Sequence, residues 1–258
     1  MLDRVLPFDG VHNFRDYGGY ALAGGGRLRA GRLYRSGQYA EASPADIERL
    51  KNLRLRAIAD LRGPSERRGA AGPDPVALAA RVVLVEEETA GLAPHIEAAR
   101  KVGTAEAAVQ AMTAGYAELP FRPTLMTVLR GYLLALAAED GATLVHCMAG
   151  KDRTGFAVAL VHALLGVRED ELMADYLLTN TAGNLEERIA AGARAMRGSL
   201  SSTFDEDTLR VLMGVRAEYL RAALSAVSTR HGGAEGYARE ALGVDAATLD
   251  ALRAKLVE

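Results

Sequence analysis

The segment from residue 142 to residue 165 constrains this 258-residue chain more than any other part of it. Residues 142–146 form an apolar run that is typical of a buried strand, and residues 156–165 form one that is typical of a buried helix. The short loop between them carries Cys147, the only cysteine in the sequence. A strand, a tight loop and a helix N-terminus together hold oxyanions on backbone N–H groups. The sequence therefore predicts an anion-binding loop with a thiol at its base.

The loop also contains the side chains that a cysteine nucleophile aimed at phosphorus requires. Arg153, six positions after Cys147, offers a planar fork that donates two hydrogen bonds to phosphate oxygens and stabilises transition-state charge. The hydroxyl of Thr154 and the loop N–H groups would stabilise the thiolate, which is the nucleophilic form of cysteine. Asp152 beside a phosphate site makes sense if it is protonated and donates to the leaving oxygen. A salt bridge that braces the loop is the alternative for Asp152.

We therefore assign two overlapping sets of candidate residues to this loop. The catalytic set is Cys147, Arg153, Asp152, Thr154 and His146. The phosphate-binding set is Met148, Ala149, Gly150, Lys151, Asp152 and Arg153. An inert, buried cysteine is the alternative for Cys147, since free cysteine is among the most buried residue types. The combination of neighbours in a strand-to-helix context argues against that alternative.

Composition excludes several other classes of protein. A net charge of −2 gives no general attraction to nucleic acid. One cysteine excludes an internal disulfide framework, and the five histidines show no ligand spacing, so we expect neither a metal nor a cofactor. We expect no stable membrane insertion, and a cytoplasmic location or export without a signal peptide, because no signal-peptide core or spanning apolar run is present. The sequence does not indicate an oligomeric state.

The remaining pattern alternates strands with helices and predicts an α/β fold with a mostly parallel central sheet flanked by helices. Further strands are expected at residues 33–35, 57–61 and 81–85. Helices are expected from Ser43 and Pro44 to about Lys51, and from Pro123 to about Glu139.

We expect one domain over residues 1–258, with a helical insertion at about 86–120 and a helical C-terminal part at about 168–258. Helix starts in that C-terminal part are expected near Arg168, near Thr181, at a capping box from Thr203 to Glu206, and at Asp245.

Beyond the loop, short motifs over nearly the whole chain resemble the Cys-dependent protein tyrosine phosphatases, in a bacterial branch of tyrosine and lipid phosphatases. These motifs are residues 13–19, 33–36, 60–62 with Glu66 and Arg67, 174–177 with Asn180, and 214–220. The resemblance implies a tyrosine-phosphatase-like fold and a metal-independent reaction in two steps. Cys147 would attack phosphorus and form a phosphocysteine, which water then hydrolyses while Thr154 eases departure of the thiolate.

The resemblance also implies roles for residues outside the loop. Asp152 would be the general acid, and Asp60 is its competitor, although holding an arginine or a loop amide is the use we favour for Asp60. The supporting residues are Asp60, Arg62, Arg15 and Asp16, with Arg35 also expected to brace the floor of the site.

Members of this branch carry a mobile helical lid, and residues 86–120 occupy the corresponding place with a much less similar sequence. The resemblance implies phosphotyrosine substrates, with phosphoserine, phosphothreonine and phosphoinositides as further ones. Lys151 resembles a second cation that helps lipid phosphatases to bind a polyanionic head group. The expected partner is therefore a phosphorylated protein or a phosphoinositide.

Two other functions remain open at the level of sequence. One is a pseudophosphatase that binds phosphorylated partners without cleaving them, and the other is a rhodanese-type sulfurtransferase. The presence of Cys147, Arg153 and Asp152 argues against the first, and Thr154 after the arginine argues against the second.

Overall fold

A computed structural model describes residues 4–72, 78–88, 94–99, 103–187, 189–190 and 205–258. Its five-stranded sheet has the order β1-β2-β5-β3-β4, and only the short edge strand β1 runs antiparallel to its neighbour. The strands are β1 (Arg15–Asp16), β2 (Leu33–Ser36), β3 (Leu55–Asp60), β4 (Arg81–Val83) and β5 (Ala142–His146). The predicted mostly parallel α/β fold is therefore confirmed.

The sheet separates two apolar clusters because successive side chains of a strand point to opposite faces. Ile58 and Leu144, which are register partners, belong to the smaller cluster. Their chain neighbours Ala59 and Val145 belong to the larger one. Both faces of the central strands are buried, as expected for a parallel sheet between helical layers.

Helices make up most of the remaining structure, and none among the described residues is long and apolar enough to cross a membrane. The longer helices are α1 (Pro44–Asn52), α4 (Ala105–Glu118), α5 (Pro123–Ala138), α6 (Asp152–Leu164), α7 (Glu169–Leu177), α10 (Glu206–Met213), α11 (Ala217–His231) and α13 (Ala246–Leu256). The shorter ones are α2 (Pro64–Gly69), α3 (Pro94–Ala99), η2 (Leu119–Phe121), α8 (Thr179–Ala182), α12 (Ala234–Gly236) and η3 (Tyr237–Ala241).

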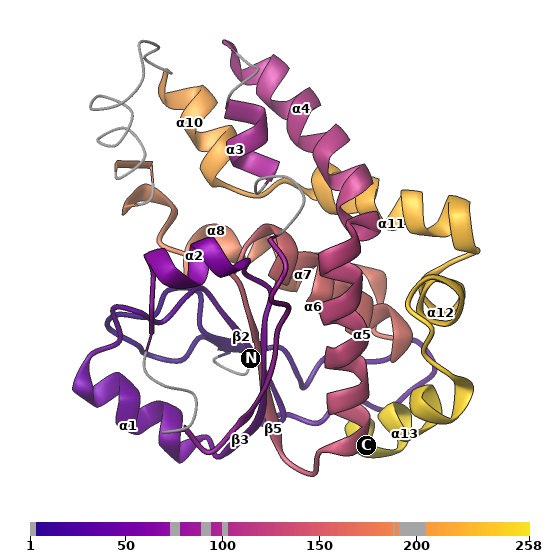
Figure 1. The fold of residues 1–258 in the computed structure, drawn as a ribbon. Coiled ribbons are helices and arrows are strands. Elements are labelled where there is room, and N and C mark those ends of the chain that lie inside the picture. The colour runs from indigo at the N-terminus through magenta and orange to yellow at the C-terminus, as the bar shows by residue number, and fades with distance from the viewer. Residues whose placement is uncertain (1–3, 73–77, 89–93, 100–102, 188, 191–204) are drawn as a thin grey trace.

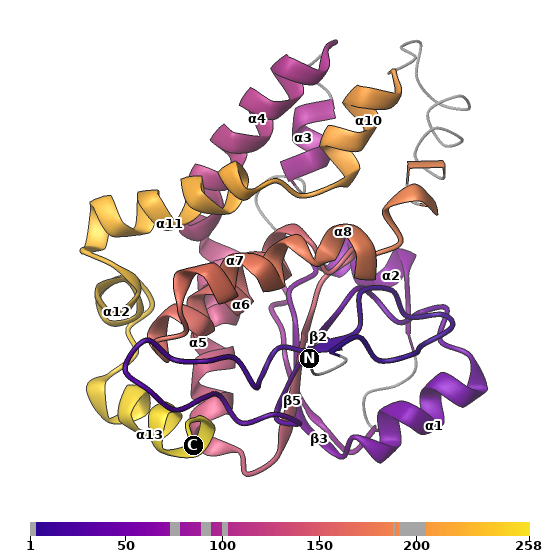
Figure 2. The ribbon, with the colours of Figure 1, turned by 180° about the vertical axis from the view of Figure 1, so that it is seen from behind.

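The helices lie around the sheet in separate groups, and their positions define the surroundings of the loop after β5 (Figures 1 and 2). Helix α1 lies on one side of the sheet, and α5 with α13 lies on the other. Helices α3, α4 and α10 stand together beyond the carboxyl ends of the strands, where α2, α7 and α8 also lie. The loop that follows β5 therefore opens toward this group of helices.

Several helix boundaries follow from local sequence signals. Ser43 caps α1 by accepting a hydrogen bond from the Asp46 N–H at 3.1 Å, with Pro44 at the first helical position, as predicted. The predicted helix from Pro123 and the predicted start at Asp245 are confirmed as α5 and α13.

The predicted capping box at Thr203 is wrong. Thr203 and Phe204 lie outside the described residues, and α10 begins at Glu206 with Asp205 as its cap. The Asp205 carboxylate accepts from the Thr208 N–H at 2.7 Å, so a carboxylate two residues later takes the role assigned to the Thr203 hydroxyl.

The segment at about 86–120 is helical where the structure describes it, because α3 and most of α4 fall within it; residues 89–93 and 100–102 lie outside the described residues. Helix α4 turns Ala108, Met112 and Tyr116 inward at a spacing of four, and all three are fully buried. The role of this segment as a lid stays a prediction.

Candidate active site

Three parallel strands end in a row at the edge of the sheet where the candidate site lies. Ser36, His146 and Asp60 are register partners at the ends of β2, β5 and β3. Cys147 comes directly after this row and is only 3% exposed. Helix α6 begins at Asp152, before the apolar run at 156–165 from which it was predicted, so the loop is shorter than expected and Arg153 and Thr154 lie on the first turn of the helix.

The loop is held by its carbonyl oxygens. Gly150 O accepts hydrogen bonds from Asn13 Nδ2 at 2.7 Å and from Arg35 Nη2 at 2.9 Å, and Met148 O accepts from the Gln38 N–H at 2.9 Å. In a trans peptide the N–H points opposite to the carbonyl. The N–H groups that follow Met148 and Gly150 are therefore directed away from these anchors.

Gly150 is required by its conformation and by its surroundings. Its φ of +61° lies in the left-handed region, which glycine adopts without steric cost. A Cβ at this position would lie 2.4 Å from the carbonyl oxygen of Ser36. Any other residue would push the loop away from β2.

Arg153 is held as a fork by a residue to which the sequence analysis gave no role. Its Nη1 and Nη2 each donate to one carboxylate oxygen of Glu66 at 2.6 Å, and Nη1 also donates to Leu61 O at 2.9 Å. Burial alone would lower the pKa of Arg153, but Glu66 and the charge of Cys147 raise it above its usual value. The guanidinium is therefore charged and fixed before any ligand binds.

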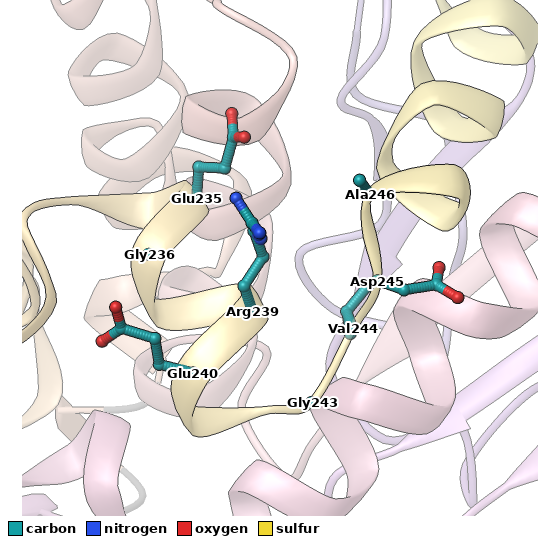
Figure 3. A pocket seen from close by; sticks show the side chains of 8 residues that line it. All are labelled: Glu235, Gly236, Arg239, Glu240, Gly243, Val244, Asp245 and Ala246. Atoms are coloured by element: carbon teal, nitrogen blue, oxygen red, sulfur yellow. The ribbon is translucent and has the colours of Figure 1, made fainter.

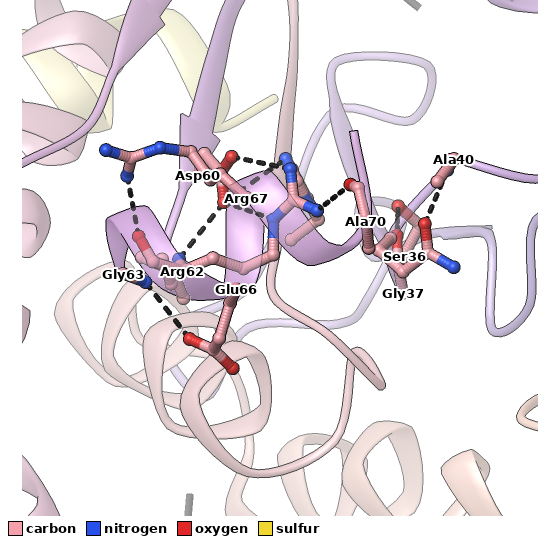
Figure 4. A network of polar contacts seen from close by, with 12 residues as sticks. Ser36, Gly37, Ala40, Asp60, Arg62, Gly63, Glu66, Arg67 and Ala70 are labelled. Atoms are coloured by element: carbon pink, nitrogen blue, oxygen red, sulfur yellow. Dashed lines mark hydrogen bonds and ion pairs between the residues drawn. The ribbon is translucent and has the colours of Figure 1, made fainter. Parts of the chain in front are cut away.

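Glu66 owes its position to the start of α2 (Figure 4). The helix begins at Pro64, and Glu66 Oε2 accepts from the Gly63 N–H at 3.0 Å. Burial would raise the pKa of Glu66, yet its hydrogen bonds with Arg153 outweigh burial and lower it. A glutamate two residues after a proline indicates the first turn of a helix, but nothing in that local pattern indicates the distant Arg153.

Asp60 serves as a clamp for Arg62, the arrangement expected of a brace (Figure 4). Asp60 Oδ1 accepts from the Arg62 N–H at 3.0 Å and from Arg62 Nε at 2.9 Å, and Oδ2 accepts from Nη2 at 2.8 Å. Burial would raise the pKa of Asp60, but the electrostatic interaction with His146, the charge of Arg62 and these hydrogen bonds lower it. Arg62 also donates to Ala70 O at 2.8 Å and so closes the turn around α2.

His146, which directly precedes Cys147, is fully buried. Its ring lies 4.8 Å from that of Tyr39, centroid to centroid, and its Nε2 lies 3.7 Å from Asp60 Oδ1. Burial lowers its pKa to about 4, although the nearby Asp60 acts in the opposite direction. The imidazole is therefore neutral at neutral pH, and its assignment as a catalytic residue stays a prediction.

Beneath the loop lies a floor network of Arg15, Arg35 and Asp175, all buried. Asp175 Oδ1 accepts from Arg15 Nε at 3.0 Å, and Oδ2 accepts from Arg35 Nη1 at 2.6 Å. Burial would raise the pKa of Asp175, but the charges of Arg15 and Arg35 hold it well below its usual value. Arg35 connects this network to Gly150 O, so the floor supports the loop directly.

Asp16 binds main-chain N–H groups and has a different role from the floor network. Its two carboxylate oxygens accept from the N–H groups of Gly18 at 2.7 Å and Gly31 at 2.6 Å. Asp16 thus ties together the two turns that follow β1 and precede β2. It supports the loop through the main chain and not through an ion pair with the floor network.

Asp152 and Lys151 face a cluster of helices at the mouth of the loop. Asp152 Oδ1 accepts from the Tyr116 hydroxyl at 2.7 Å and lies 3.4 Å from Lys151 Nζ. Lys151 Nζ also donates to Leu212 O, near the end of α10, at 2.6 Å. Both side chains are buried, and Thr154 on the first turn of α6 is buried with them.

A separate groove of about 720 Å³ lies between the α12–η3 turn and the start of α13 (Figure 3). Its charged lining residues are Glu235, Arg239, Glu240 and Asp245. None of the candidate site residues contributes to it.

Comparison with known proteins extends the likeness to nearly the whole chain. The profile of the tyrosine phosphatase family matches residues 6–258. A putative tyrosine-protein phosphatase of Cupriavidus necator is 38% identical over 254 residues, which cover 95% of this chain and 86% of the relative. Triple specificity protein phosphatase PtpB of Mycobacterium tuberculosis is 34% identical over 284 residues, which cover both chains completely. The resemblance stated from sequence motifs is confirmed.

The floor network generates a prediction about stability. Asp175→Asn leaves Arg15 and Arg35 buried without their counter-charge, so the free energy of unfolding should fall by about 3–5 kcal/mol in urea denaturation at pH 7. Because the pKa of Asp175 is lowered on folding, its contribution is present above about pH 4 and is lost as the pH falls. The difference between wild type and variant should therefore narrow below about pH 4.

The matched control is Asp170→Asn on the same helix, where the carboxylate pairs with Arg168 in solvent. This change should leave unfolding at pH 7 unaltered, because exposed ion pairs contribute little. Equal losses in the two variants would contradict a special role for the floor network.

Proposed function

The chain belongs to the tyrosine phosphatase family, and on this premise we propose that it hydrolyses phosphomonoesters through a phosphocysteine formed on Cys147. One observation carries the proposal. Cys147 lies at the base of a loop whose carbonyls are anchored by other elements, and Arg153, on the first turn of the helix that follows the loop, is already fixed as a fork.

Arg153 has the donors needed to bind a phosphate without releasing Glu66. A guanidinium carries five N–H donors. Glu66 and Leu61 take both donors of Nη1 and one of Nη2. Among the contacts of the described residues, the Nε and remaining Nη2 donors stay available along one edge. That edge offers two parallel hydrogen bonds, the geometry that suits a phosphate.

The reaction then proceeds by two displacements at phosphorus. The Cys147 thiolate attacks, an S–P bond forms and the bond from phosphorus to the leaving oxygen breaks, while Asp152 transfers its proton to that oxygen. Water next attacks the phosphocysteine and gives a proton to the Asp152 carboxylate. A P–O bond forms as the S–P bond breaks, and the thiolate returns with support from the Thr154 hydroxyl. Arg153 stabilises the equatorial charge in both steps.

The proposed substrates are phosphotyrosine proteins first, then phosphoserine and phosphothreonine proteins and phosphoinositides. A relative named as a triple specificity phosphatase supports this breadth. Lys151 bears on the phosphoinositide part, because its ammonium is buried against Leu212 O and Asp152. To bind a second phosphate group, the ammonium must exchange its bond to Leu212 O for one to the head group.

Replacement of the nucleophile tests the proposed mechanism. Cys147→Ser should abolish turnover of p-nitrophenyl phosphate and of phosphotyrosine peptides, because serine is not ionised at neutral pH. It should retain phosphopeptide binding in calorimetry, because the N–H cradle and Arg153 remain. Adding Arg153→Ala to Cys147→Ser should then remove binding. Turnover that survives in Cys147→Ser would overturn the nucleophile, and an inactive wild type that binds phosphopeptides would indicate a pseudophosphatase.

A second pair of variants tests the general acid. Asp152→Asn should lower kcat/KM by about 10²–10⁴-fold for poor leaving groups such as phenyl phosphate, and far less for p-nitrophenyl phosphate, which needs no acid. It should also flatten the basic limb of the pH profile. Asp60→Asn should lower thermal stability and reduce activity with little dependence on the leaving group, because Asp60 clamps Arg62. The reverse pattern would make Asp60 the acid.

Lys151→Ala tests the phosphoinositide substrate. The variant should lose more kcat/KM on a phosphoinositide than on a phosphotyrosine peptide, because each added phosphate gains from a nearby cation. The comparison uses short-chain soluble phosphoinositides, so that membrane binding does not contribute. Equal losses on the two substrates would limit Lys151 to its contacts with Leu212 and Asp152.

A further inference from the structure

A chain of hydrogen bonds leads from helix α7 to the carboxyl group of Asp152. Tyr176 donates from its hydroxyl to the Tyr116 hydroxyl at 2.8 Å, and Tyr116 donates to Asp152 Oδ1 at 2.7 Å. Tyr116 is fully buried, and Tyr176 and Asp152 are 1% and 3% exposed. Side chains of three helices, α4, α6 and α7, are therefore linked through one carboxyl oxygen.

The direction of this chain is fixed by chemistry. An ionised carboxylate accepts hydrogen bonds only, so the single hydroxyl proton of Tyr116 must point to Asp152. The Tyr116 oxygen is then left to accept the proton of Tyr176. Burial, and after it the charge of Asp152, raises the pKa of Tyr116 and of Tyr176 well above the usual value, so both remain donors.

Packing prevents the two rings from turning away. Gly155, on the first turn of α6, allows Tyr176 to approach: a Cβ there would lie 2.8 Å from Tyr176 Cε2. On the other side, the ring of Tyr219 lies 5.6 Å from that of Tyr116, centroid to centroid. The two hydroxyl groups are thus held in place relative to the catalytic loop.

We propose that Tyr116, supported by Tyr176, is a positioning residue that orients Asp152 for proton transfer to the leaving group. This inference rests on the proposed assignment of Asp152 as the general acid. The Tyr116 hydroxyl and Lys151 Nζ both contact Asp152 Oδ1. Because an oxygen that accepts hydrogen bonds is favoured as the carbonyl oxygen of a carboxylic acid, we assign the transferable proton to Oδ2. Without Tyr116, Oδ1 loses its 2.7 Å hydrogen bond and keeps the longer contact with Lys151, so the preference for a proton on Oδ2 weakens.

Tyr116→Phe removes the hydroxyl and keeps the ring. On the acidic plateau of the pH profile, kcat/KM for phenyl phosphate should fall about tenfold, while that for p-nitrophenyl phosphate stays within about twofold. A hydrogen bond donated to a carboxylate favours its ionised form. Its loss should therefore move the basic limb of kcat/KM to higher pH by about one unit. A purely structural role predicts equal losses on both substrates and an unmoved limb, and that result would overturn the proposal.

Two further variants keep the test decisive. Tyr219→Phe removes a neighbouring hydroxyl that contacts Val211 O at 3.5 Å, and it should change neither the leaving-group dependence nor the pH profile. Tyr176→Phe leaves Tyr116 in place and should shift both measurements in the same direction as Tyr116→Phe but by less. It therefore remains informative if Tyr116→Phe fails to fold. An unchanged Tyr176→Phe would overturn the supporting role of Tyr176.

A double-variant cycle separates this inference from the proposed function. In the Asp152→Asn background, Tyr116→Phe should cause no further leaving-group dependence, because the group that it positions is absent. A further loss there as large as in the wild type would overturn the positioning role. Leaving-group dependence in Asp152→Asn but not in Tyr116→Phe would overturn the inference alone. A wild type without phosphatase activity would overturn both.

Discussion

The site depends on one buried carboxylate shared by two arginines. Asp175 neutralises one of the two charges of Arg15 and Arg35, so the floor network keeps a net positive charge beneath the loop. Arg35 donates a hydrogen bond to Gly150 O and so connects the floor network to the loop. Gly150 has a left-handed conformation and lies so close to Ser36 that a side chain at this position would clash with it. The net charge beneath the loop and the conformation of Gly150 thus both depend on residues outside the loop.

On the other side of the loop, a comparable arrangement holds Arg153. Glu66 fixes Arg153 through two short hydrogen bonds, and α2 fixes Glu66 through its first turn. A side chain that is already ordered loses little entropy when a ligand binds. Asp60 and Arg62 hold the turn from which α2 starts. They therefore support the site by fixing the position of α2.

Short sequence patterns were sufficient to predict those parts of the fold whose determining residues are neighbours in the chain. The strand, loop and helix around Cys147 and the capped start of α1 at Ser43 were predicted from neighbouring residues. The partners of Arg153 and Lys151 were not, because Glu66 and Leu212 lie 87 and 61 positions away in the chain. The misplaced cap of α10 has another cause: Thr203 and Asp205 are both acceptable N-caps, and sequence alone did not rank them.

The single cysteine has a consequence for the survival of the protein under oxidative conditions. The thiolate form that would attack phosphorus is also the form that peroxide oxidises to a sulfenic acid. Many such thiols are rescued by a second cysteine that forms a disulfide, but this chain has no second cysteine. Ring closure with a backbone nitrogen would protect the sulfenic acid from further oxidation, but the return to the thiolate requires reduction by a thiol from another molecule. Because Cys147 is almost completely buried, the size of the reductant that can reach it becomes part of the chemistry of the site.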